Sequence, residues 1–429
     1  MKGTHLTIAL AMVFTLVPVT LLVPGLHELV VVAHGGTTSD AHAFMTVNML
    51  AGMCTVPLAM RFARRRGDVR WWIVGALLVD AVAFVGMWSA PSLGVLYAYR
   101  ILDGAVHLPA VTLLMVASNR FSGEKRGGAL GALASAIMIG VAIGSPLGGW
   151  LVDRWAGWVY AVGALLLVLA ALISSSMAQL PAAEATPAGA AGRYEWNRSQ
   201  LQTWIPLGYG FMDRFSIGIF VSTFTLFLSQ EHGLGASQKG VLIALFMLPF
   251  AMLCYPAGRL ADRIGWFAPM LVGNVLFGLV FASYGFVPKT WLPVVMILSG
   301  VLSALMFAPN LLLISDLAQR RGGGEGLFGA FQVAGSMGFL VGPIVGGILV
   351  AATTTADGVP AYAAIFALVG GLEAALALLT WAALRGLARE VRSSRAHDLR
   401  RALSRSALPG SDLLPGGDLP AAVRSDGSP

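Results

Sequence analysis

The chain has 429 residues, of which 57% are hydrophobic and only 11% are charged, and its mean hydropathy is +0.76. A soluble domain carries about 25% charged residues. The low charged fraction of this chain therefore excludes a soluble domain of this length and indicates a protein that lies in lipid. The net charge of +7 comes from residues between apolar runs and in the tail, which indicates membrane topology rather than nucleic-acid binding. Both cysteines, Cys54 and Cys254, lie inside apolar runs and predict neither a disulfide framework nor a metal site.

Apolar runs follow one another along the whole chain. We count roughly twelve, each near the ~20 residues that cross a bilayer. The first is interpreted as a retained helix rather than a secretion signal, because it stays apolar to Ala33 and has no small-x-small cleavage site. The runs lie near residues 6–31, 42–62, 71–90, 93–117, 128–151, 157–179, 204–229, 237–257, 267–287, 291–316, 326–351 and 360–384. The predicted class is an all-α membrane protein.

The loops between these runs differ in basic charge, and the basic set is predicted to be cytoplasmic, together with both termini. This set contains Arg64, Arg65, Arg66, Arg70, Arg120, Lys125, Arg126, Arg193, Arg198, Arg320 and Arg321. The Pro- and Ala-rich segment 181–203 is predicted to be a cytoplasmic linker between one bundle over 1–180 and a second over 204–386. A basic, mostly disordered cytoplasmic tail is expected over 387–429. The stretch 385–403, where the tail begins, is expected to form either a helix on the inner leaflet or a solvated stretch.

A short charged stretch, Gly258-Arg259-Leu260-Ala261-Asp262-Arg263-Ile264-Gly265, lies between two apolar runs and is predicted to be a turn at the membrane surface. A degraded copy lies over 57–66, where Arg61 aligns with Arg263 and Met60 replaces the acid. Half-length repeats are typical of many transporter folds.

This stretch resembles the signature loop of the major facilitator superfamily of transporters. The resemblance implies two six-helix bundles related by a pseudo-two-fold axis, both termini in the cytoplasm, and secondary transport by alternating access. It also implies a cytoplasmic gate formed by Arg61, Gly258, Asp262, Arg263 and Gly265.

Two glycine series repeat between the halves, and small residues at this spacing let helices touch closely. A Gly-x-x-x-Gly-Pro-x-x-Gly-Gly pattern in the fifth helix resembles the antiporter motif of the same superfamily, which implies an exporter; in the first series, which lies in the fifth run, the proline is displaced by one position. The two series are Gly140, Gly144, Pro146, Gly148 and Gly149, and Gly338, Gly342, Pro343, Gly346 and Gly347.

The fourth run contains Arg100, Asp103 and His107, whose i, i+3, i+7 spacing places them on one helix face. Charges inside a span are energetically costly and mark function by default. We expect Asp103 to pair with Arg100 or His107, and the face to line the central cavity and carry proton coupling. Arg100 with Gly104 also resembles the fourth-helix arginine motif of proton-coupled members. The alternative is a self-neutralising structural cluster.

Further charges lie near the middle of other runs. Asp213 and Arg214 in the seventh run are adjacent, point about 100° apart and are not expected to neutralise each other on one face; we expect them to contribute to the cavity. Asp80 and Glu373 are interpreted as lone acids on helices that are peripheral in the family fold.

The expected function is proton-coupled export of a small, amphipathic drug or metabolite across a bacterial inner membrane. No phosphate-binding glycine motif is present, so the proton gradient is the expected energy source, with no cofactor and no metal. The expected partners are the substrate and the bilayer, with no nucleic acid, and the protein is expected to be a monomer and not an enzyme. Three alternatives remain: a metabolite importer or symporter, a lipid flippase of the same fold, and a transport-inactive scaffold or receptor.

Overall fold

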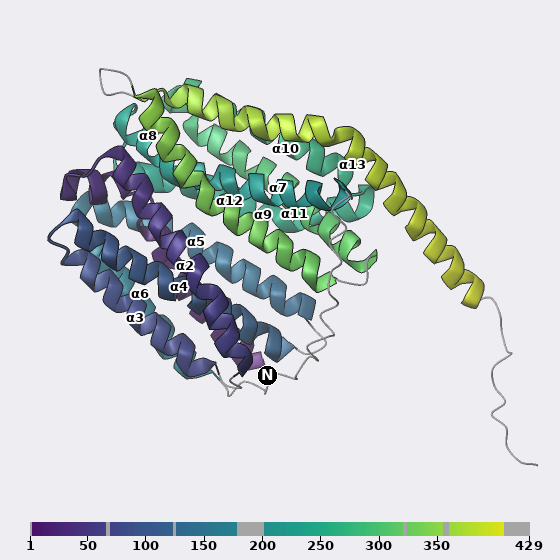
Figure 1. The fold of residues 1–429 in the computed structure, drawn as a ribbon, viewed down its shortest axis with the longest axis horizontal. Coiled ribbons are helices and arrows are strands. Elements are labelled where there is room, and N and C mark those ends of the chain that lie inside the picture. Colours follow the sequence, from purple (N-terminus) through teal and green to yellow (C-terminus); the bar gives the residue numbers. More distant parts are fainter. Residues whose placement is uncertain are drawn as a thin grey trace, which may run out of the picture.

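The computed structural model describes residues 2–65, 69–122, 126–177, 201–320, 324–354 and 360–406, and these ranges are almost entirely helical, with no β-strand (Figure 1). Most of the expected linker and the last part of the expected tail lie outside the described residues. Each predicted apolar run overlaps a helix. Ten helical segments of the described chain are long and apolar enough to cross a membrane, which confirms the helical membrane class.

The described residues of the amino-terminal part form α1 (Lys2–Leu21), the π-helical η1 (His27–Val32), α2 (Thr38–Arg65), α3 (Arg70–Trp88), α4 (Leu93–Ser122), α5 (Arg126–Trp155) and α6 (Trp158–Ser175). The carboxy-terminal part begins with α7 (Leu201–Ile219), the π-helical η3 (Phe220–Phe224), α8 (Thr225–Gln230) and α9 (Ala236–Ile264). It continues with α10 (Phe267–Ser283), η4 (Tyr284–Phe286), η5 (Lys289–Trp291), α11 (Leu292–Arg320), α12 (Gly324–Thr353) and α13 (Tyr362–Ser406).

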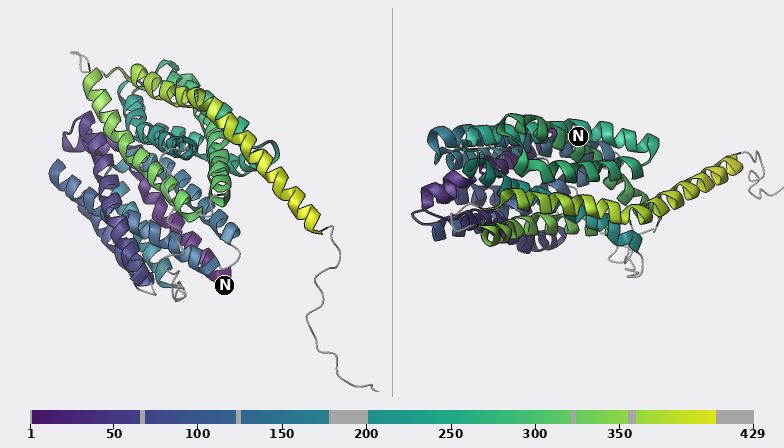
Figure 2. Two further views of the ribbon diagram at one scale, coloured as in Figure 1. Left: turned by 45° about the vertical axis from the view of Figure 1, so that its right-hand side comes forward. Right: turned by 90° about the horizontal axis from the view of Figure 1, so that it is seen from above.

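Helix packing follows the same order in both parts. In the first, α1 packs on α5, α2 on α4, and α3 on α6; in the second, α7 packs on α12, α9 on α11, and α10 on α13. The two groups meet chiefly where α5 packs on α9 and α2 packs on α12. Figure 2 shows the groups side by side in further views. Because the pairings correspond in order, the two parts are structural repeats.

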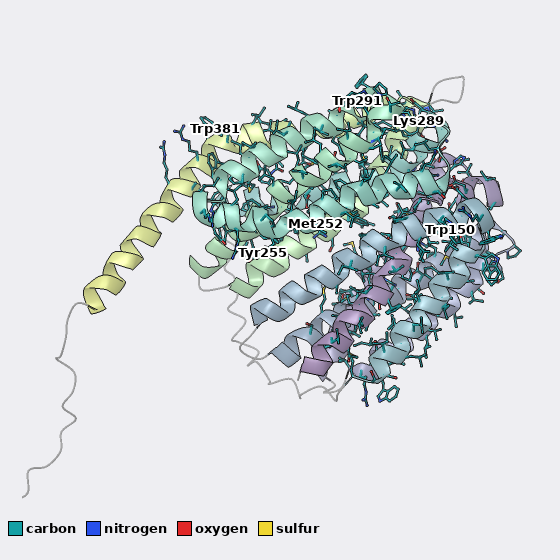
Figure 3. The ribbon with its side chains drawn as sticks, turned by 180° about the vertical axis from the view of Figure 1, so that it is seen from behind. Trp150, Met252, Tyr255, Lys289, Trp291 and Trp381 are labelled. Carbon is teal, nitrogen blue, oxygen red and sulfur yellow. The ribbon has the colours of Figure 1, made fainter. Side chains whose placement is uncertain are left out.

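The surface that faces away from these contacts is apolar. Met252 is 73% exposed and Trp291 61% exposed, and such side chains cover the outside of the helices in Figure 3. Exposed apolar surface on this scale is unfavourable in water and favourable against lipid.

The two ends of the molecule differ. We call the end that holds η1 and the 231–235 turn the outer end, following the orientation that the basic loops predict. The amino terminus and the last turns of α13 lie toward the opposite, inner end in Figure 1.

One boundary differs from that expected. Residues 258–264 are not a turn but the last turns of α9, and only Gly265, at φ 90°, and Trp266 separate α9 from α10. The α13 helix continues across 387 to Ser406, in agreement with the helix alternative over 385–403, and the rest of the expected tail lies outside the described residues. No glycine or proline occurs over 387–406, and the arginines, alanines and leucines there favour helix in water as well as in lipid. At 1.5 Å per residue, a helix of this length spans about 68 Å, so its end must extend beyond the hydrocarbon core.

Candidate buried proton site

Arg100 and Asp103 on α4 are buried in the amino-terminal bundle and bonded to each other. Arg100 also donates from Nε to the Phe44 carbonyl at 3.4 Å, and its guanidinium lies 4.6 Å from the centre of the Phe44 ring. Asn48 Nδ2 donates to Asp103 Oδ2 at 2.9 Å. The pair is therefore held by α2. Gly104 permits this approach, because a Cβ there would overlap the backbone carbonyl of Asn48.

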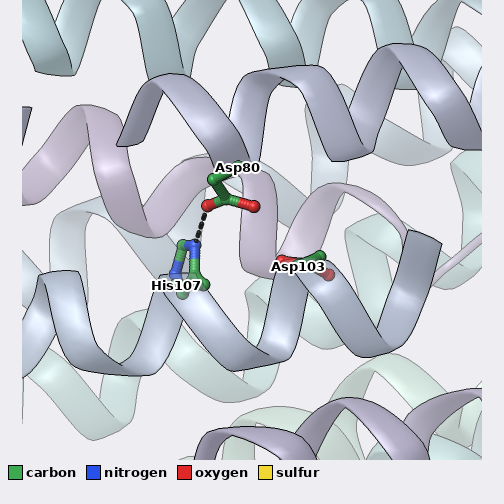
Figure 4. A group of neighbouring side chains, drawn as sticks. All are labelled: Asp80, Asp103 and His107. Atoms are coloured by element: carbon green, nitrogen blue, oxygen red, sulfur yellow. Dashed lines mark hydrogen bonds and ion pairs between the residues drawn. The ribbon is translucent and has the colours of Figure 1, made fainter. Parts of the chain in front are cut away.

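His107 pairs with Asp80 of α3 and not with Asp103. Its Nδ1 donates to Asp80 Oδ2 at 2.6 Å (Figure 4). Asp80 is therefore not the lone acid that the sequence indicated. Ligand atoms of Asp80, Asp103 and His107 lie within 4.8 Å of one another. Within the described residues, His107 Nε2 and Asp80 Oδ1 have no hydrogen-bond partner, so the group retains unused hydrogen-bonding capacity.

The four side chains face neighbouring helices and not an open central cavity, which differs from the expectation. Arg100, Asp103 and His107 border a hollow of about 30 Å³, which is lined also by Val19, Met49 and Phe84. That volume is enough for at least one water molecule, because a water needs roughly 10–15 Å³ of such space. The donor set suits a proton better than a divalent cation, since the Arg100 guanidinium already occupies an Asp103 oxygen and adds positive charge.

The second charged pair lies on α7. Arg214 Nε lies 3.7 Å from Asp213 Oδ2, so the adjacent residues do approach each other, contrary to the expectation. The long Arg side chain makes this possible, and its guanidinium lies 5.6 Å from the centre of the Phe307 ring on α11. The Arg214 side chain is 33% exposed, whereas that of Asp213 is 9% exposed.

Glu373 on α13 is fully buried and also has a partner that the sequence did not reveal. Ser216 of α7 donates to Glu373 Oε2 at 2.8 Å. About two turns toward the inner end, Tyr209 on α7 and Thr380 on α13 share a 2.7 Å hydrogen bond. For both Asp80 and Glu373, the sequence offered one indication of a partner: an acid inside a membrane span is energetically costly and therefore requires a polar partner on another helix.

The two glycine series bring helix backbones together in matching ways. A Cβ at Gly148 would overlap the Leu21 carbonyl of α1, and one at Gly338 would overlap the Phe211 carbonyl of α7. The other members on the same faces, Gly140, Gly144, Gly342 and Gly346, also lie against α1 or against α7 and η3. The last member of each series touches the opposite half: Gly149 lies against Ala236 of α9, and Gly347 lies against His42 of α2. Pro146 and Pro343 lie within α5 and α12.

The expected gate residues are not assembled. Asp262 and Arg263 lie exposed in the last turn of α9, and in the described part of the chain neither has an ion-pair partner. Asp262 is thus near a helix C-terminus, where a negative charge is unfavourable, and not beside an N-terminus. Gly258 is inside the helix, and Arg61 is in the last turn of α2, where its side chain lies outside the described residues.

Polar contacts join the halves at the outer end. Lys239 of α9 is fully buried and its Nζ lies 2.8 Å from Glu28 Oε1 and 2.7 Å from Ser229 Oγ. Asp153 at the end of α5 accepts from the backbone N–H groups of Ala236 and Ser237 at 2.7 and 2.8 Å, which caps α9. We call Glu28, Asp153, Ser229 and Lys239 the outer latch. Sequence reasoning did not identify it.

A second contact between halves involves His42 on α2. Its Nδ1 donates to the Thr38 carbonyl at 2.9 Å, so its Nε2 accepts from Thr223 Oγ1 at 3.0 Å. Beside it, a hollow of about 380 Å³ between α2 and α12 is lined mainly by apolar side chains, including Val47, Ile344 and Ile348.

Comparison with known proteins assigns the family. The profile of the Major Facilitator Superfamily matches residues 8–209 and again 206–414. The Fatty acid resistance protein FarB of Neisseria gonorrhoeae is 30% identical over 145 residues, which is 33% of this chain and 28% of that protein. The Methyl viologen resistance protein SmvA of Salmonella typhimurium is 31% identical over 123 residues, or 28% of this chain and 25% of that protein. The matches thus span little more than a quarter of these relatives.

Solved structures agree in fold over most of the chain. The nucleoside transporter NupG has a TM-score of 0.72 at 14% identity, covering 89% of this chain and 99% of that one. A bacterial homolog of the human lysosomal transporter Spinster, in an inward-facing conformation, has a TM-score of 0.71 at 15% identity, covering 91% and 97%. At such identities the likeness concerns the fold alone. With two family matches across the chain, this fold and ten membrane-spanning segments, the chain belongs to the Major Facilitator Superfamily and is a multi-pass membrane transporter, not an enzyme.

Proposed function

We propose that the protein exports a small amphipathic molecule by alternating access, driven by the inward flow of protons, in a bacterial inner membrane. The observation that carries this proposal is the buried group of Arg100, Asp103, His107 and Asp80. It contains two acids and one permanent cation, and it lies inside the amino-terminal bundle.

The charges of this group require one proton. With His107 neutral, Arg100, Asp103 and Asp80 sum to one negative charge; with His107 protonated, the four side chains sum to zero. A net charge costs several kcal/mol in a low-dielectric interior, so the neutral, protonated state is favoured while the group is closed. Exposure to water removes that preference, which couples proton release to a conformational change.

The direction of transport and the kind of cargo are proposed from resemblance. The matched relatives are named for resistance to fatty acid and to methyl viologen, and resistance by transport requires export. The glycine series that resembles the antiporter motif supports the same direction. Apolar side chains around the hollow between α2 and α12 suit a cargo with an apolar portion.

The test uses purified protein in liposomes that contain a pH-sensitive dye. With a long-chain fatty acid or methyl viologen as the probe, we expect substrate movement to carry protons in the opposite direction. Asp80→Asn and His107→Gln should each reduce proton-driven transport at least tenfold. The matched control is Glu231→Gln, which removes an exposed acid in the 231–235 turn and should leave transport unchanged.

Two results would contradict the proposal. Full proton-driven transport by both Asp80→Asn and His107→Gln would move the coupling elsewhere. Substrate and proton moving in the same direction would make the protein a symporter of the same fold.

A further inference from the structure

The contact between α7 and α13 carries a line of polar side chains inside the carboxy-terminal bundle. On α7, Tyr209, Asp213 and Ser216 follow an i, i+4, i+7 spacing and share one face. On α13, Glu373 and Thr380 are i, i+7 and also share a face. Two hydrogen bonds join these faces, Tyr209 with Thr380 at 2.7 Å and Ser216 with Glu373 at 2.8 Å. The helices are therefore antiparallel here, and Asp213 lies between the two bonds.

Glu373 is an acid without a cation. Its exposed fraction is 0%, Ser216 donates to Oε2, and Oε1 has no partner within the described residues. No lysine or arginine of the described chain forms an ion pair with it. An ionised carboxylate buried with a single hydrogen bond would be strongly unfavourable, and the neutral acid avoids this cost.

The ionisable groups around Glu373 add no compensating charge. The α10 helix, which packs along α13, contains no ionisable side chain, and α12 contains only Glu325 in its first turn. The α7 helix contributes Tyr209, Asp213 and Arg214. Of these, Asp213 and Tyr209 interact electrostatically with Glu373. Arg214 Nε lies 3.7 Å from Asp213 Oδ2, and its guanidinium lies 5.6 Å from the centre of the Phe307 ring.

We propose that Glu373 is a second proton-binding group of this transporter, with Ser216 as its positioning residue and Asp213 as the group that exchanges the proton with it. The proton binds at Oε1 of Glu373, while Ser216 keeps its hydrogen bond to Oε2. Asp213 is paired with Arg214 when ionised, and it releases that partner when it carries the proton. The only bonds made and broken are O–H bonds.

Each half then holds one buried proton site, formed by Asp80 with His107 in the first and by Glu373 with Asp213 in the second. The claim that these protons drive transport rests on the proposed function. The claim that Glu373 binds a proton does not rest on it. Two protons per transported molecule follow if both sites empty in one cycle.

The test of binding needs no substrate. Infrared difference spectra of the purified full-length protein, recorded between acidic and alkaline pH, detect the carbonyl band of each protonated carboxylic acid. We expect Glu373→Gln to remove one band and Ser216→Ala to shift the same band, because the band frequency depends on hydrogen bonding. Glu231→Gln is the control that leaves this band in place.

Thermal unfolding gives an independent measurement. The folded wild type retains a proton that the unfolded chain releases, so its melting temperature falls as the pH rises. Glu373→Gln has the shape and neutrality of the protonated acid, so it should fold, should be at least as stable near neutral pH, and should lose part of that pH dependence. A glutamine variant that melts lower at every pH, with the band unchanged, would overturn the proposal because Glu373 would then be an ionised structural residue.

Transport separates this inference from the proposed function. In liposomes, Glu373→Gln should lower the number of protons moved per probe molecule from two to one. Asp80→Asn should remove the proton of the site in the amino-terminal half. An unchanged proton number in Glu373→Gln would overturn the transport role of this site. If the wild type moves no protons but Glu373→Gln removes the infrared band, the proposed function fails and the proton site stands.

Discussion

Single glycines decide how closely the helices of each bundle approach. Gly148 of α5 faces the Leu21 carbonyl of α1 so closely that even a methyl group would overlap backbone atoms. Backbone cannot move aside as a flexible side chain can, so a larger residue must separate the two helices. Close approach of this kind replaces the hydrophobic effect, which does not drive helix association in lipid.

We therefore expect Gly148→Ala to destabilise the protein by about 1–3 kcal/mol, the usual cost of overpacking. The measurement is the shift of the thermal unfolding midpoint in detergent. Gly371 in the α13 helix is the matched control, because a Cβ there would meet nothing within 4 Å. Gly371→Ala should be neutral or stabilise by about 0.5–1 kcal/mol; equal destabilisation by both variants would show that the close contact at Gly148 has no special role.

The glycine spacings and the buried charges could be predicted from the sequence, but the partners of those charges could not. The spacing of Arg100 and Asp103 on one helix determines their contact, and this pair was among those expected. Asp80 reaches His107 from 27 residues away, on a helix whose rotation depends on packing of the whole bundle. Glu373 was likewise interpreted as a lone acid, because Ser216 is 157 residues distant.

At the scale of elements, hydropathy locates helices well and their ends poorly. Each apolar run overlaps a helix because apolar length is a local property. The α9 and α13 helices continue beyond their apolar parts, over 258–264 and 387–406, because polar residues such as arginine also have helix propensity. No glycine or proline interrupts 387–406, and in 258–264 the helix continues through Gly258. A boundary read from hydropathy marks the expected membrane surface rather than the end of the helix.

The outer latch connects elements of both halves through one buried lysine. Lys239 is fully buried, while the Glu28 side chain is 25% exposed. Removing the acid leaves the buried lysine charge with Ser229 as its one hydrogen-bond partner among the described residues and with Asp153 as the nearby acid; leaving one member of a buried charged pair typically costs about 2–5 kcal/mol. That penalty applies only while the outer end is closed, because an opened latch lets water reach Lys239.

Glu28→Gln should therefore shift the protein toward an outward-open conformation. Spin labels at Ser39 on α2 and Ala351 on α12, in a background without Cys54 and Cys254, would report the distance between the halves at the outer end. We expect a longer distance to become populated. Lys289→Met is the matched control, because Lys289 makes only a 3.5 Å contact with the His232 carbonyl within one half; an identical shift in both variants would contradict the latch.

For the molecule as a whole, the polar contacts described between the halves all lie at the outer end. They are the outer latch, the bond from Ser237 to the Gly149 carbonyl, the bond from Gln230 to Thr38, and the bond between His42 and Thr223. At the inner end, Asp262 and Arg263 are exposed and unpaired within the described chain. This combination describes a conformation closed on the outside, in which the predicted cytoplasmic gate is not engaged. Alternating access requires the opposite state, in which the latch opens and the inner ends meet.

The gate prediction follows from that asymmetry. Asp262→Asn should change the free energy of unfolding of the outer-closed protein by no more than about 0.5 kcal/mol, as for other exposed surface residues. It should nevertheless slow transport severalfold, because the charge is needed only when the inner ends close. Transport in liposomes and labelling of an inner-end cysteine measure the two effects.

Met60→Asp, which supplies the acid that the first repeat lacks, is the comparison variant, and it should favour closure of the inner end. If Asp262→Asn changes neither rate nor accessibility while Met60→Asp alters both, the functional gate lies in the amino-terminal repeat and its assignment to α9 is wrong.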